Sequence, residues 1–265
     1  MKYTLGFIGC GNMGGALITA AAKTIAGKKI AVCDYDKTKA EKFAMQFGAN
    51  AVTSRDLAEN ADFIILGVKP QVMGETITEF ADVICTRENV TIVTMAAGLS
   101  IAAIRGYIGK DVPVIRIMPN TPVASGAGMI LYSTADVNTD TETAFLQAFA
   151  QAGLFDKISE DRMDAGSALS GCGPAFVYAF AEALADGGVE CGVPRDKAAM
   201  YAAQTLLGAA QMLLEYGHPA DLKDAVCSPG GTTIAGIHAL EDAGFRGATM
   251  SAVTAAYKRT LELKK

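Results

Sequence analysis

Tryptophan, histidine and paired cysteines are the scarcest features of this 265-residue sequence. It contains no tryptophan, two histidines and six cysteines. No two cysteines form a C-x-x-C pair, so the sequence predicts neither a zinc site nor a disulfide framework. The pattern fits free thiols in a reducing cytoplasm, and we expect no bound metal.

A net positive charge and long apolar runs are also lacking. The chain has 23 lysines and arginines against 28 aspartates and glutamates, which gives a net charge of −5. Binding nucleic acid through bulk electrostatics requires clustered basic residues, so we expect no nucleic-acid partner. No apolar run approaches the ~20 residues of a membrane helix. Together with the unpaired cysteines, these absences favour a cytoplasmic protein without nucleic-acid or membrane partners.

The first 160 residues alternate short apolar runs with helical patterns. The runs are β-branched or apolar nearly throughout, which is typical of parallel strands covered on both faces. Such alternation predicts an α/β, doubly wound sheet in residues 1–160. Two further runs, Ala127–Tyr132 and Leu154–Ile158, are expected to extend this sheet at one edge. The main predicted strands are Thr4–Ile8, Lys29–Cys33, Phe63–Val68, Val90–Met95 and Val114–Met118.

Strand patterns end near Ser159, and residues 161–265 are predicted to form an all-α domain. Within it, Arg195–Tyr216 is apolar or small around most of its circumference. Such a helix must be buried on most sides, which a domain of ~105 residues cannot easily arrange alone. The sequence therefore predicts a homodimer. The other predicted helices are Arg162–Ala168, Ala175–Cys191, Ala220–Ser228, Thr233–Ala243 and Phe245–Lys264.

A G-x-G-x-x-G loop follows the first predicted strand and opens a helix. It reads Gly9-Cys10-Gly11-Asn12-Met13-Gly14. We expect Gly9 to allow the tight turn, Gly11 to let a pyrophosphate approach the backbone, and Gly14 to let helix and strand pack closely. A purely structural glycine turn is the alternative. The full strand–loop–helix context favours a Rossmann domain that binds NADH or NADPH.

Asp34 ends the second predicted strand, twenty residues beyond Gly14. A carboxylate there would accept hydrogen bonds from the ribose hydroxyls and repel a 2′-phosphate, which favours NADH. Alternatively, Asp34 or Asp36 caps the helix that begins near Lys37. Lys37 and Lys39 could also neutralise a phosphate. NADPH therefore stays open as a cofactor.

Two glycine-rich loops in the second half suggest a carboxylate site. Each precedes a helix and is expected to present free backbone N–H groups and small side chains. Either loop alone could be only a glycine-rich helix start, but two in one domain favour substrate binding. The expected substrate-binding residues are Ser170, Gly171 and Cys172 in the first loop, and Ser228, Gly230, Gly231, Thr232 and Thr233 in the second.

Reduction of a C=O bond needs a general acid, usually histidine or lysine, and the sequence offers none at these loops. His218 lies in a turn and His238 in a predicted helix. The β-hydroxyacid dehydrogenase pattern G-x-G-x-x-x-K-x-x-x-N meets Val177 and Ala181 instead of lysine and asparagine. A C=N bond removes this requirement, because an imine nitrogen can be protonated near neutral pH. The enzyme then needs chiefly to position the iminium against the nicotinamide.

From end to end the chain resembles the 1-pyrroline-5-carboxylate reductase family, whose members reduce a cyclic imine carboxylate to L-proline with NAD(P)H. The segment Ser228–Thr233, continuing through Leu240-Glu241, carries the most specific part of the resemblance. The other matching segments are Phe7–Gly14, Gly67–Gln71, Met95–Gly98, Met118–Pro122, Leu169–Ala175 and Glu182–Gly188.

The resemblance implies an active site between the Rossmann domain of one subunit and a helical dimer. Gly230, Gly231, Thr232 and the Thr233 amide would hold the substrate carboxylate, with the Thr233 hydroxyl near the imine nitrogen as the catalytic group. Ser170 and Gly171 would line the pocket. Assembly of dimers into a larger ring stays open. The expected cofactor residues beyond the glycine loop and Asp34 are Ser54, Val68, Lys69, Pro70, Ala96, Ala97 and Asn120.

Some positions depart from the family pattern or allow another interpretation. Cys172 stands where many relatives have serine, and Asp34 where NADP-using relatives often have a small polar residue. Lys69 could be a catalytic acid, but Pro70 follows it, which favours a role in orienting the cofactor. Reduction of a related cyclic imine or keto acid is a second hypothesis. A dinucleotide-binding redox sensor without chemistry is a third.

Overall fold

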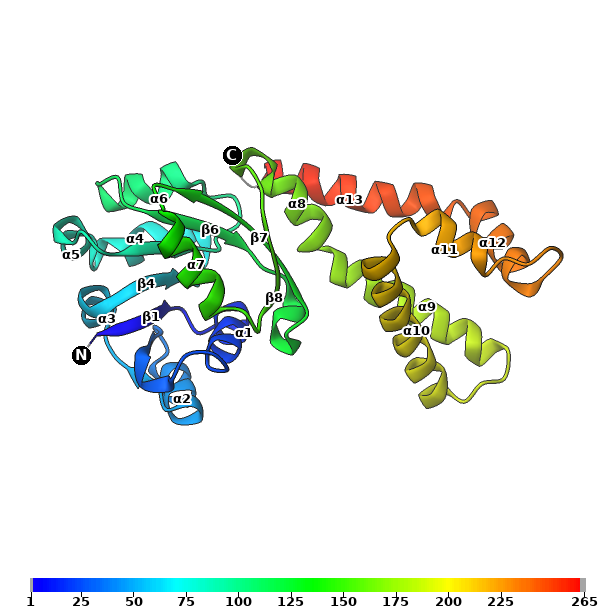
Figure 1. Ribbon diagram of the computed structural model, residues 1–265, viewed down its shortest axis with the longest axis horizontal. Helices are drawn as coiled ribbons and strands as arrows, with labels where there is room; N and C mark the ends of the chain where they lie inside the picture. The colour runs from blue at the N-terminus through cyan, green and yellow to red at the C-terminus, as the bar shows by residue number, and fades with distance from the viewer. Residues whose placement is uncertain (1, 263–265) are drawn as a thin grey trace. The chain divides into compact units, whose positions relative to one another are not determined.

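The computed structural model describes residues 2–262, which divide into two compact units (Figure 1). Unit 1 comprises residues 2–172 and 257–262, and unit 2 comprises Gly173–Ala256. The boundary expected at residues 160 and 161 precedes α8 (Met163–Ser170), which packs on β7 (Gly128–Ala135) within unit 1. The last three residues of the expected second domain lie outside the described residues.

Unit 1 is built on one sheet with the strand order β3-β2-β1-β4-β5-β6-β7-β8. Strands β1 to β6 run parallel, β7 is antiparallel to β6, and β8 is parallel to β7. The two expected edge runs are thus confirmed as β7 and β8. The other bounds are β1 Tyr3–Ile8, β2 Ile30–Cys33, β3 Asn50–Ala51, β4 Ala61–Leu66, β5 Thr91–Thr94, β6 Val114–Met118 and β8 Gly153–Lys157.

Helices cover both faces of the sheet, which confirms the doubly wound arrangement. One core cluster contains Leu17 of α1 and Phe145 of α7, and the opposite cluster contains Leu57 of α3 and Ile104 of α6. Strand side chains therefore alternate between two apolar cores, as expected for a covered parallel sheet. The helix bounds in unit 1 are α1 Asn12–Ala21, α2 Lys37–Phe47, α3 Ser54–Asn60, α4 Met73–Thr78, α5 Ala81–Thr86, α6 Ile101–Ile108 and α7 Thr139–Ala148.

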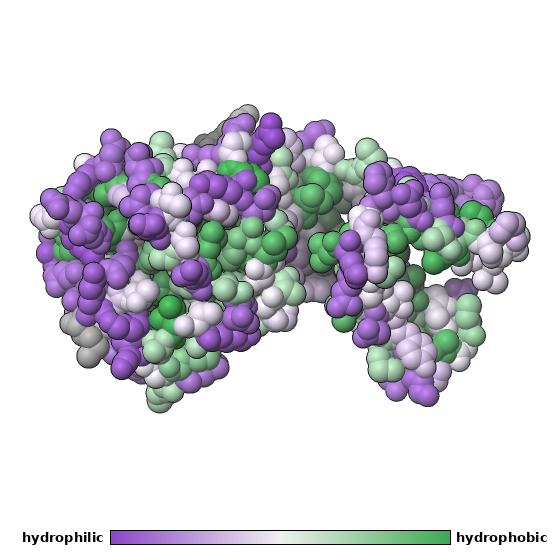
Figure 2. Space-filling view, viewed as in Figure 1, coloured by the Kyte–Doolittle hydropathy of each residue, from purple (hydrophilic) through white to green (hydrophobic). Residues whose placement is uncertain are grey.

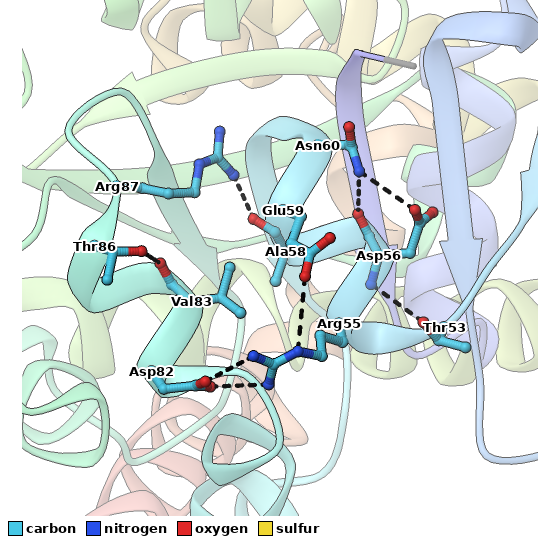
Figure 3. Close-up of polar contacts among 10 residues, drawn as sticks. All are labelled: Thr53, Arg55, Asp56, Ala58, Glu59, Asn60, Asp82, Val83, Thr86 and Arg87. Atoms are coloured by element: carbon cyan, nitrogen blue, oxygen red, sulfur yellow. Dashed lines mark hydrogen bonds and ion pairs between the residues drawn. The ribbon is translucent and has the colours of Figure 1, made fainter.

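Polar contacts hold α3 against α5 in unit 1 (Figure 3). Arg55 donates two hydrogen bonds to the Asp82 carboxylate, at 3.1 and 2.7 Å, and the Thr53 hydroxyl caps α3 by accepting from the Asp56 N–H. The ion pair is exposed, so solvent screening leaves it only a small contribution to stability. Its consequence is positional, because α3 begins at Ser54, an expected cofactor residue.

A buried arginine in β6 ties the sheet to α8. Arg116 is almost fully buried and forms ion pairs with Glu160 at 3.0 Å and Asp164 at 3.3 Å. Glu160 also accepts from the Ile101 N–H at 2.7 Å, which links the same network to the start of α6. Removing one partner of a buried ion pair typically costs about 3–5 kcal/mol, so this network fixes where α8 lies on unit 1.

Unit 2 is entirely helical in the described chain, and it has very little core of its own. Its buried hydrophobic residues are three alanines, Ala185, Ala198 and Ala202, where α9 packs against α10. Large apolar side chains are exposed on its surface, including Leu214 and Met250, and hydrophobic patches are visible in Figure 2. The bounds are α9 Gly173–Glu190, α10 Arg195–Tyr216, α11 Pro219–Ala225, α12 Thr232–Asp242 and α13 Phe245–Glu262, whose last residues belong to unit 1.

One stretch corrects the expectation about membrane-length segments. The helical stretch Glu160–Glu190 contains an apolar segment of 18 residues, little of which is buried in this single chain. Length and composition alone would allow it to cross a membrane. The segment is apolar because α9 carries many alanines and several exposed apolar side chains. Such a composition is equally typical of a helix that is covered by a partner subunit.

Candidate functional site

The glycine loop between β1 and α1 has the geometry that the sequence predicts. Gly9 has φ = 103°, and a Cβ there would lie 2.7 Å from the carbonyl carbon of Gly67. A Cβ on Gly14 would lie 2.1 Å from the Gly9 carbonyl oxygen. Gly9 therefore requires glycine for its backbone conformation and for its close contact with Gly67, which follows β4. Gly14 requires glycine because α1 packs closely against the loop at this position.

Gly11 differs from the other two glycines because packing within the chain does not require it. A Cβ on Gly11 would meet no atom within 4 Å, and the residue is exposed at the N-cap of α1. The first N–H groups of α1 point from this end, where the helix dipole favours negative charge. Space at Gly11 beside these donors fits the approach of a pyrophosphate, so the loop suits a dinucleotide.

The side chains of the loop do not compete with this role. Cys10 is buried, its thiol donates to the Cys33 carbonyl oxygen at 3.6 Å, and burial raises the pKa of this thiol to about 12. Cys10 is therefore a neutral packing group at physiological pH rather than a nucleophile. Asn12 is exposed and Met13 is half-buried in the first turn of α1.

Asp34 and Asp36 have different partners, which resolves the alternatives that the sequence left open. Asp36 caps α2, because its carboxylate accepts from the N–H and the hydroxyl of Thr38. Asp34 instead accepts from the Cys10 N–H at 2.6 Å and from the Asp36 N–H at 2.9 Å. Asp34 therefore faces the glycine loop and does not cap the helix.

A cavity of about 920 Å³ opens beside the glycine loop, at the carboxyl ends of the parallel strands. Such an end, near the first strand, is where open α/β sheets bind their ligands. Ser54 lines this cavity, and its hydroxyl donates to Glu79 at 2.6 Å. Expected cofactor residues that line the cavity are Gly9, Asp34, Ser54 and Val68.

The remaining expected cofactor residues follow the neighbouring parallel strands. Val68, Lys69 and Pro70 follow β4, with Lys69 exposed and Pro70 opening a short 3-10 helix. Ala96 and Ala97 follow β5, and Asn120 follows β6. Because these strands are parallel to β1, all their carboxyl ends meet at the edge that carries the glycine loop.

Asn120 joins the two expected halves of the site within unit 1, a role that sequence reasoning missed. Its side chain is buried, with the residue 8% exposed. The amide oxygen accepts from the Met129 N–H at 2.9 Å, and the amide nitrogen donates to the Ser170 carbonyl oxygen at 2.9 Å. Asn120 thus positions the end of α8, where the first glycine-rich loop begins. The sequence indicated Asn120 only through the segment Met118–Pro122, which carries part of the family resemblance, and that segment did not predict these two partners.

The first glycine-rich loop differs from the expectation of free N–H groups. The N–H groups of Gly171 and Cys172 both donate to the Ser167 carbonyl oxygen, at 2.8 and 3.2 Å, because the chain continues nearly as a helix from α8 toward α9. The Ser170 hydroxyl donates to the Gly166 carbonyl oxygen at 3.0 Å. These residues can line a pocket, but the Gly171 and Cys172 amides are already used within the chain.

The second glycine-rich loop, Ser228–Thr233, lies at the start of α12 in unit 2. Gly230 has φ = 68°, a left-handed conformation that favours glycine, and the Gly231 N–H donates to the Ser228 carbonyl oxygen. Gly231 is therefore not a free donor either. Thr232 and Thr233 form the first turn of α12 and are exposed. Helix geometry leaves the N–H groups of this turn without partners inside the helix.

The described residues contain no group of three or more histidine, cysteine, aspartate or glutamate side chains that could hold a metal ion. The six cysteines are all free thiols. The arrangement in the described chain thus offers a dinucleotide loop, a cavity lined by Asp34, and an exposed helix start suited to an anion.

Comparisons with known proteins cover both units. Residues 160–263 match the family described as pyrroline-5-carboxylate reductase dimerisation, and residues 4–98 match NADP oxidoreductase coenzyme F420-dependent. Pyrroline-5-carboxylate reductase from Glycine max is 40% identical over 267 residues, covering 99% of this chain and 96% of the relative. The protein of that name from Escherichia coli is 38% identical over 271 residues, covering both chains fully.

Comparison with solved structures points to the same family as the sequence relatives. A pyrroline-5-carboxylate reductase from Coxiella burnetii superposes with a TM-score of 0.91 at 31% identity, covering all of both chains. A pyrroline carboxylate reductase from Plasmodium falciparum, with NADP bound, has a TM-score of 0.87 at 30% identity and covers 99% of this chain and 98% of its own. The resemblance seen in the sequence is confirmed, and the chain belongs to the pyrroline-5-carboxylate reductase family.

Proposed function

We propose that this protein reduces the cyclic imine 1-pyrroline-5-carboxylate to L-proline, the last step of proline biosynthesis. The observation that carries the proposal is similarity over the whole chain, at 38–40% identity, to relatives named pyrroline-5-carboxylate reductase. The chain is an NAD(P)H-dependent oxidoreductase, and the reduced nicotinamide supplies the hydride. All remaining steps require positioning rather than a strong acid or base in the protein.

The glycine loop would hold the cofactor pyrophosphate, with Gly11 leaving room above the N-terminus of α1. Asp34 and the cavity beside it would take the adenosine ribose. Residues after β4, β5 and β6 would flank the nicotinamide. In this arrangement Lys69 orients the cofactor, because it is exposed and precedes a proline at a strand end.

Substrate recognition would centre on the start of α12. The Thr232 and Thr233 N–H groups lie in its first turn, where unpaired donors and the helix dipole favour a carboxylate. Gly230 and Gly231 would let the ligand approach the main chain, while Ser228, Ser170, Gly171 and Cys172 would line the pocket. The Thr233 hydroxyl would contact the imine nitrogen and hold its proton in place.

The protein would work as a homodimer. Unit 2 buries almost only alanine side chains by itself while exposing leucine, methionine and tyrosine, so a second copy is needed to cover them. The match to the dimerisation family supports this interpretation. The apolar stretch Glu160–Glu190 would then be covered by protein rather than lipid, in a cytoplasmic enzyme without membrane or nucleic-acid partners. Assembly of dimers into a larger ring would use further surfaces.

The proposal also assigns the two halves of the chain their tasks, with residues 1–160 binding the cofactor and residues 161–265 binding the substrate and the second subunit. Steady-state oxidation of NADH and of NADPH, with pyrroline-5-carboxylate, tests the activity. A six-membered cyclic imine and an open-chain keto acid serve as comparison substrates. Faster turnover of either comparison substrate would contradict the proposal, and cofactor binding without any turnover would favour a redox sensor.

A further inference from the structure

We propose that this chain selects NADH over NADPH, and that Asp34 decides the selection at the ribose 2′ position. The inference rests on the proposed NAD(P)H-dependent reduction for its cofactor class. It goes further by naming the cofactor and the residue. Three observations on unit 1 carry it: the orientation of Asp34, the charge of the cavity beside it, and the place of the nearby lysines.

Asp34 is held in one orientation by two main-chain donors. Its two carboxylate oxygens accept from the Cys10 and Asp36 N–H groups, at 2.6 and 2.9 Å. An ionised carboxylate has about four acceptor positions, so two stay available for the ribose hydroxyls. Because Asp36 caps α2 by itself, helix capping does not occupy the Asp34 carboxylate. The carboxylate is therefore preorganised between the glycine loop and the cavity.

The cavity is strongly acidic. Its lining includes four carboxylates, those of Asp34, Glu41, Glu75 and Glu79, and one basic side chain, that of Lys37. Lys39, the other lysine of this segment, is not among the lining residues. Glu79 is further fixed by the Ser54 hydroxyl. Burial, followed by the charges of Glu79 and Asp34, raises the pKa of the Cys33 thiol, which agrees with a negative field at this edge.

The two cofactors differ in what they would bring to this cavity. A ribose with free 2′ and 3′ hydroxyls offers two hydrogen-bond donors. The Asp34 carboxylate has acceptor positions left for both of them. A 2′-phosphate has acceptor oxygens and about −1.5 to −2 charges at neutral pH, so it repels the same carboxylate. One lysine does not balance four carboxylates. We expect NAD⁺ to bind at least about tenfold more tightly than NADP⁺, which corresponds to about 1.4 kcal/mol.

The test measures binding of NAD⁺ and NADP⁺ to the whole protein by titration calorimetry, without any imine. It compares wild type with Asp34→Asn and with the matched control Asp36→Asn. The control removes the same charge from the same segment, and asparagine still caps a helix well. We expect Asp34→Asn to shift the ratio of the two dissociation constants toward NADP⁺ by about tenfold, and Asp36→Asn to leave the ratio within about twofold of wild type.

Either of two results would overturn the inference. One is wild-type protein that binds NADP⁺ as tightly as NAD⁺ or more tightly, a measurement that does not depend on any variant. The other is an equal shift in both variants, because bulk charge rather than Asp34 would then set the ratio. Failure of the proposed function has a different signature, since selective NAD⁺ binding would persist while pyrroline-5-carboxylate is not reduced.

Discussion

Thr233 is the side chain on which the proposed chemistry depends most directly. Replacing it with alanine removes the hydroxyl placed near the imine nitrogen and keeps the backbone N–H groups of α12. A hydrogen bond to a charged group contributes about 1.5–3 kcal/mol, so we expect kcat/KM to fall about tenfold or more. The dissociation constant for the dinucleotide should stay unchanged, because the proposed cofactor residues all belong to unit 1 and Thr233 belongs to unit 2.

Thr249→Ala is the matched control for this measurement. Thr249 is an exposed threonine of unit 2 whose hydroxyl donates to the Phe245 carbonyl oxygen within α13. The control tests whether loss of a threonine hydroxyl in these helices is enough to lower activity. Turnover of Thr233→Ala at the wild-type rate would remove Thr233 from the mechanism.

Asn120 carries a different prediction, because both ends of its amide are used inside unit 1. Asn120→Ala leaves the Met129 N–H and the Ser170 carbonyl oxygen, which belong to half-buried residues, without this partner. A fully buried unsatisfied group costs about 1–3 kcal/mol, and half-buried groups cost less because water can replace the lost partner. We expect a lower Tm and a higher KM for the imine, together with weaker dinucleotide binding, because the proposed function also places Asn120 beside the nicotinamide. Loss of dinucleotide affinity with an unchanged KM for the imine would contradict the proposed link from Asn120 to the substrate loop.

Asn120→Asp separates the two hydrogen bonds. An ionised aspartate still accepts from the Met129 N–H but cannot donate to the Ser170 carbonyl oxygen. If the link to Ser170 positions the substrate loop, this variant should raise the KM for the imine. Its Tm should also fall, because the buried carboxylate would face the Ser170 carbonyl oxygen. A KM equal to that of wild type would assign Asn120 a purely structural role.

Among the elements, the glycine loop contains two glycines, Gly11 and Gly14, whose substitution should have different effects. Gly11→Ala meets no atom within 4 Å, so Tm should stay near the wild-type value while NADH affinity falls about tenfold, because the methyl group occupies the pyrophosphate approach. Gly14→Ala pushes a Cβ into the Gly9 carbonyl oxygen and should lower both Tm and affinity. Thermal unfolding and fluorescence titration distinguish these outcomes. Equal effects on Tm would contradict the assignment.

Element boundaries show where local pattern was sufficient. The predicted ranges Val114–Met118 and Arg195–Tyr216 are confirmed to the residue as β6 and α10. The predicted helix Ala220–Ser228 is shorter than expected, because α11 ends at Ala225. Strand β3 was missed, since two residues are too few for an alternating pattern.

At the scale of the whole molecule, unit 2 depends on covering its exposed apolar side chains. Leu214 on α10 is 83% exposed in the single chain, and Met45 on α2 of unit 1 is 82% exposed. We expect Leu214→Glu to weaken the dimer in sedimentation experiments and lower Tm, while the matched Met45→Glu leaves both unchanged. The Tm of wild type should rise with protein concentration, as for any dimer that stabilises its folded subunits. An unaltered dimer in Leu214→Glu would place the interface elsewhere.

The α/β class, the glycine loop and the family could all be predicted from the sequence, because they depend on local spacing: apolar periodicity, glycines at set intervals and short motifs. Tertiary structure alone decided which aspartate caps α2 and which faces the cavity. It also decided that Asn120 reaches Ser170 and that the Gly171 and Cys172 amides already have a partner. The physical reason is that hydrogen-bond partners are chosen by distance in space. Asp34 and Asp36 lie two residues apart in the same turn, so the sequence around them does not separate their roles. In the folded chain Asp34 lies against the Cys10 N–H and Asp36 against the Thr38 N–H.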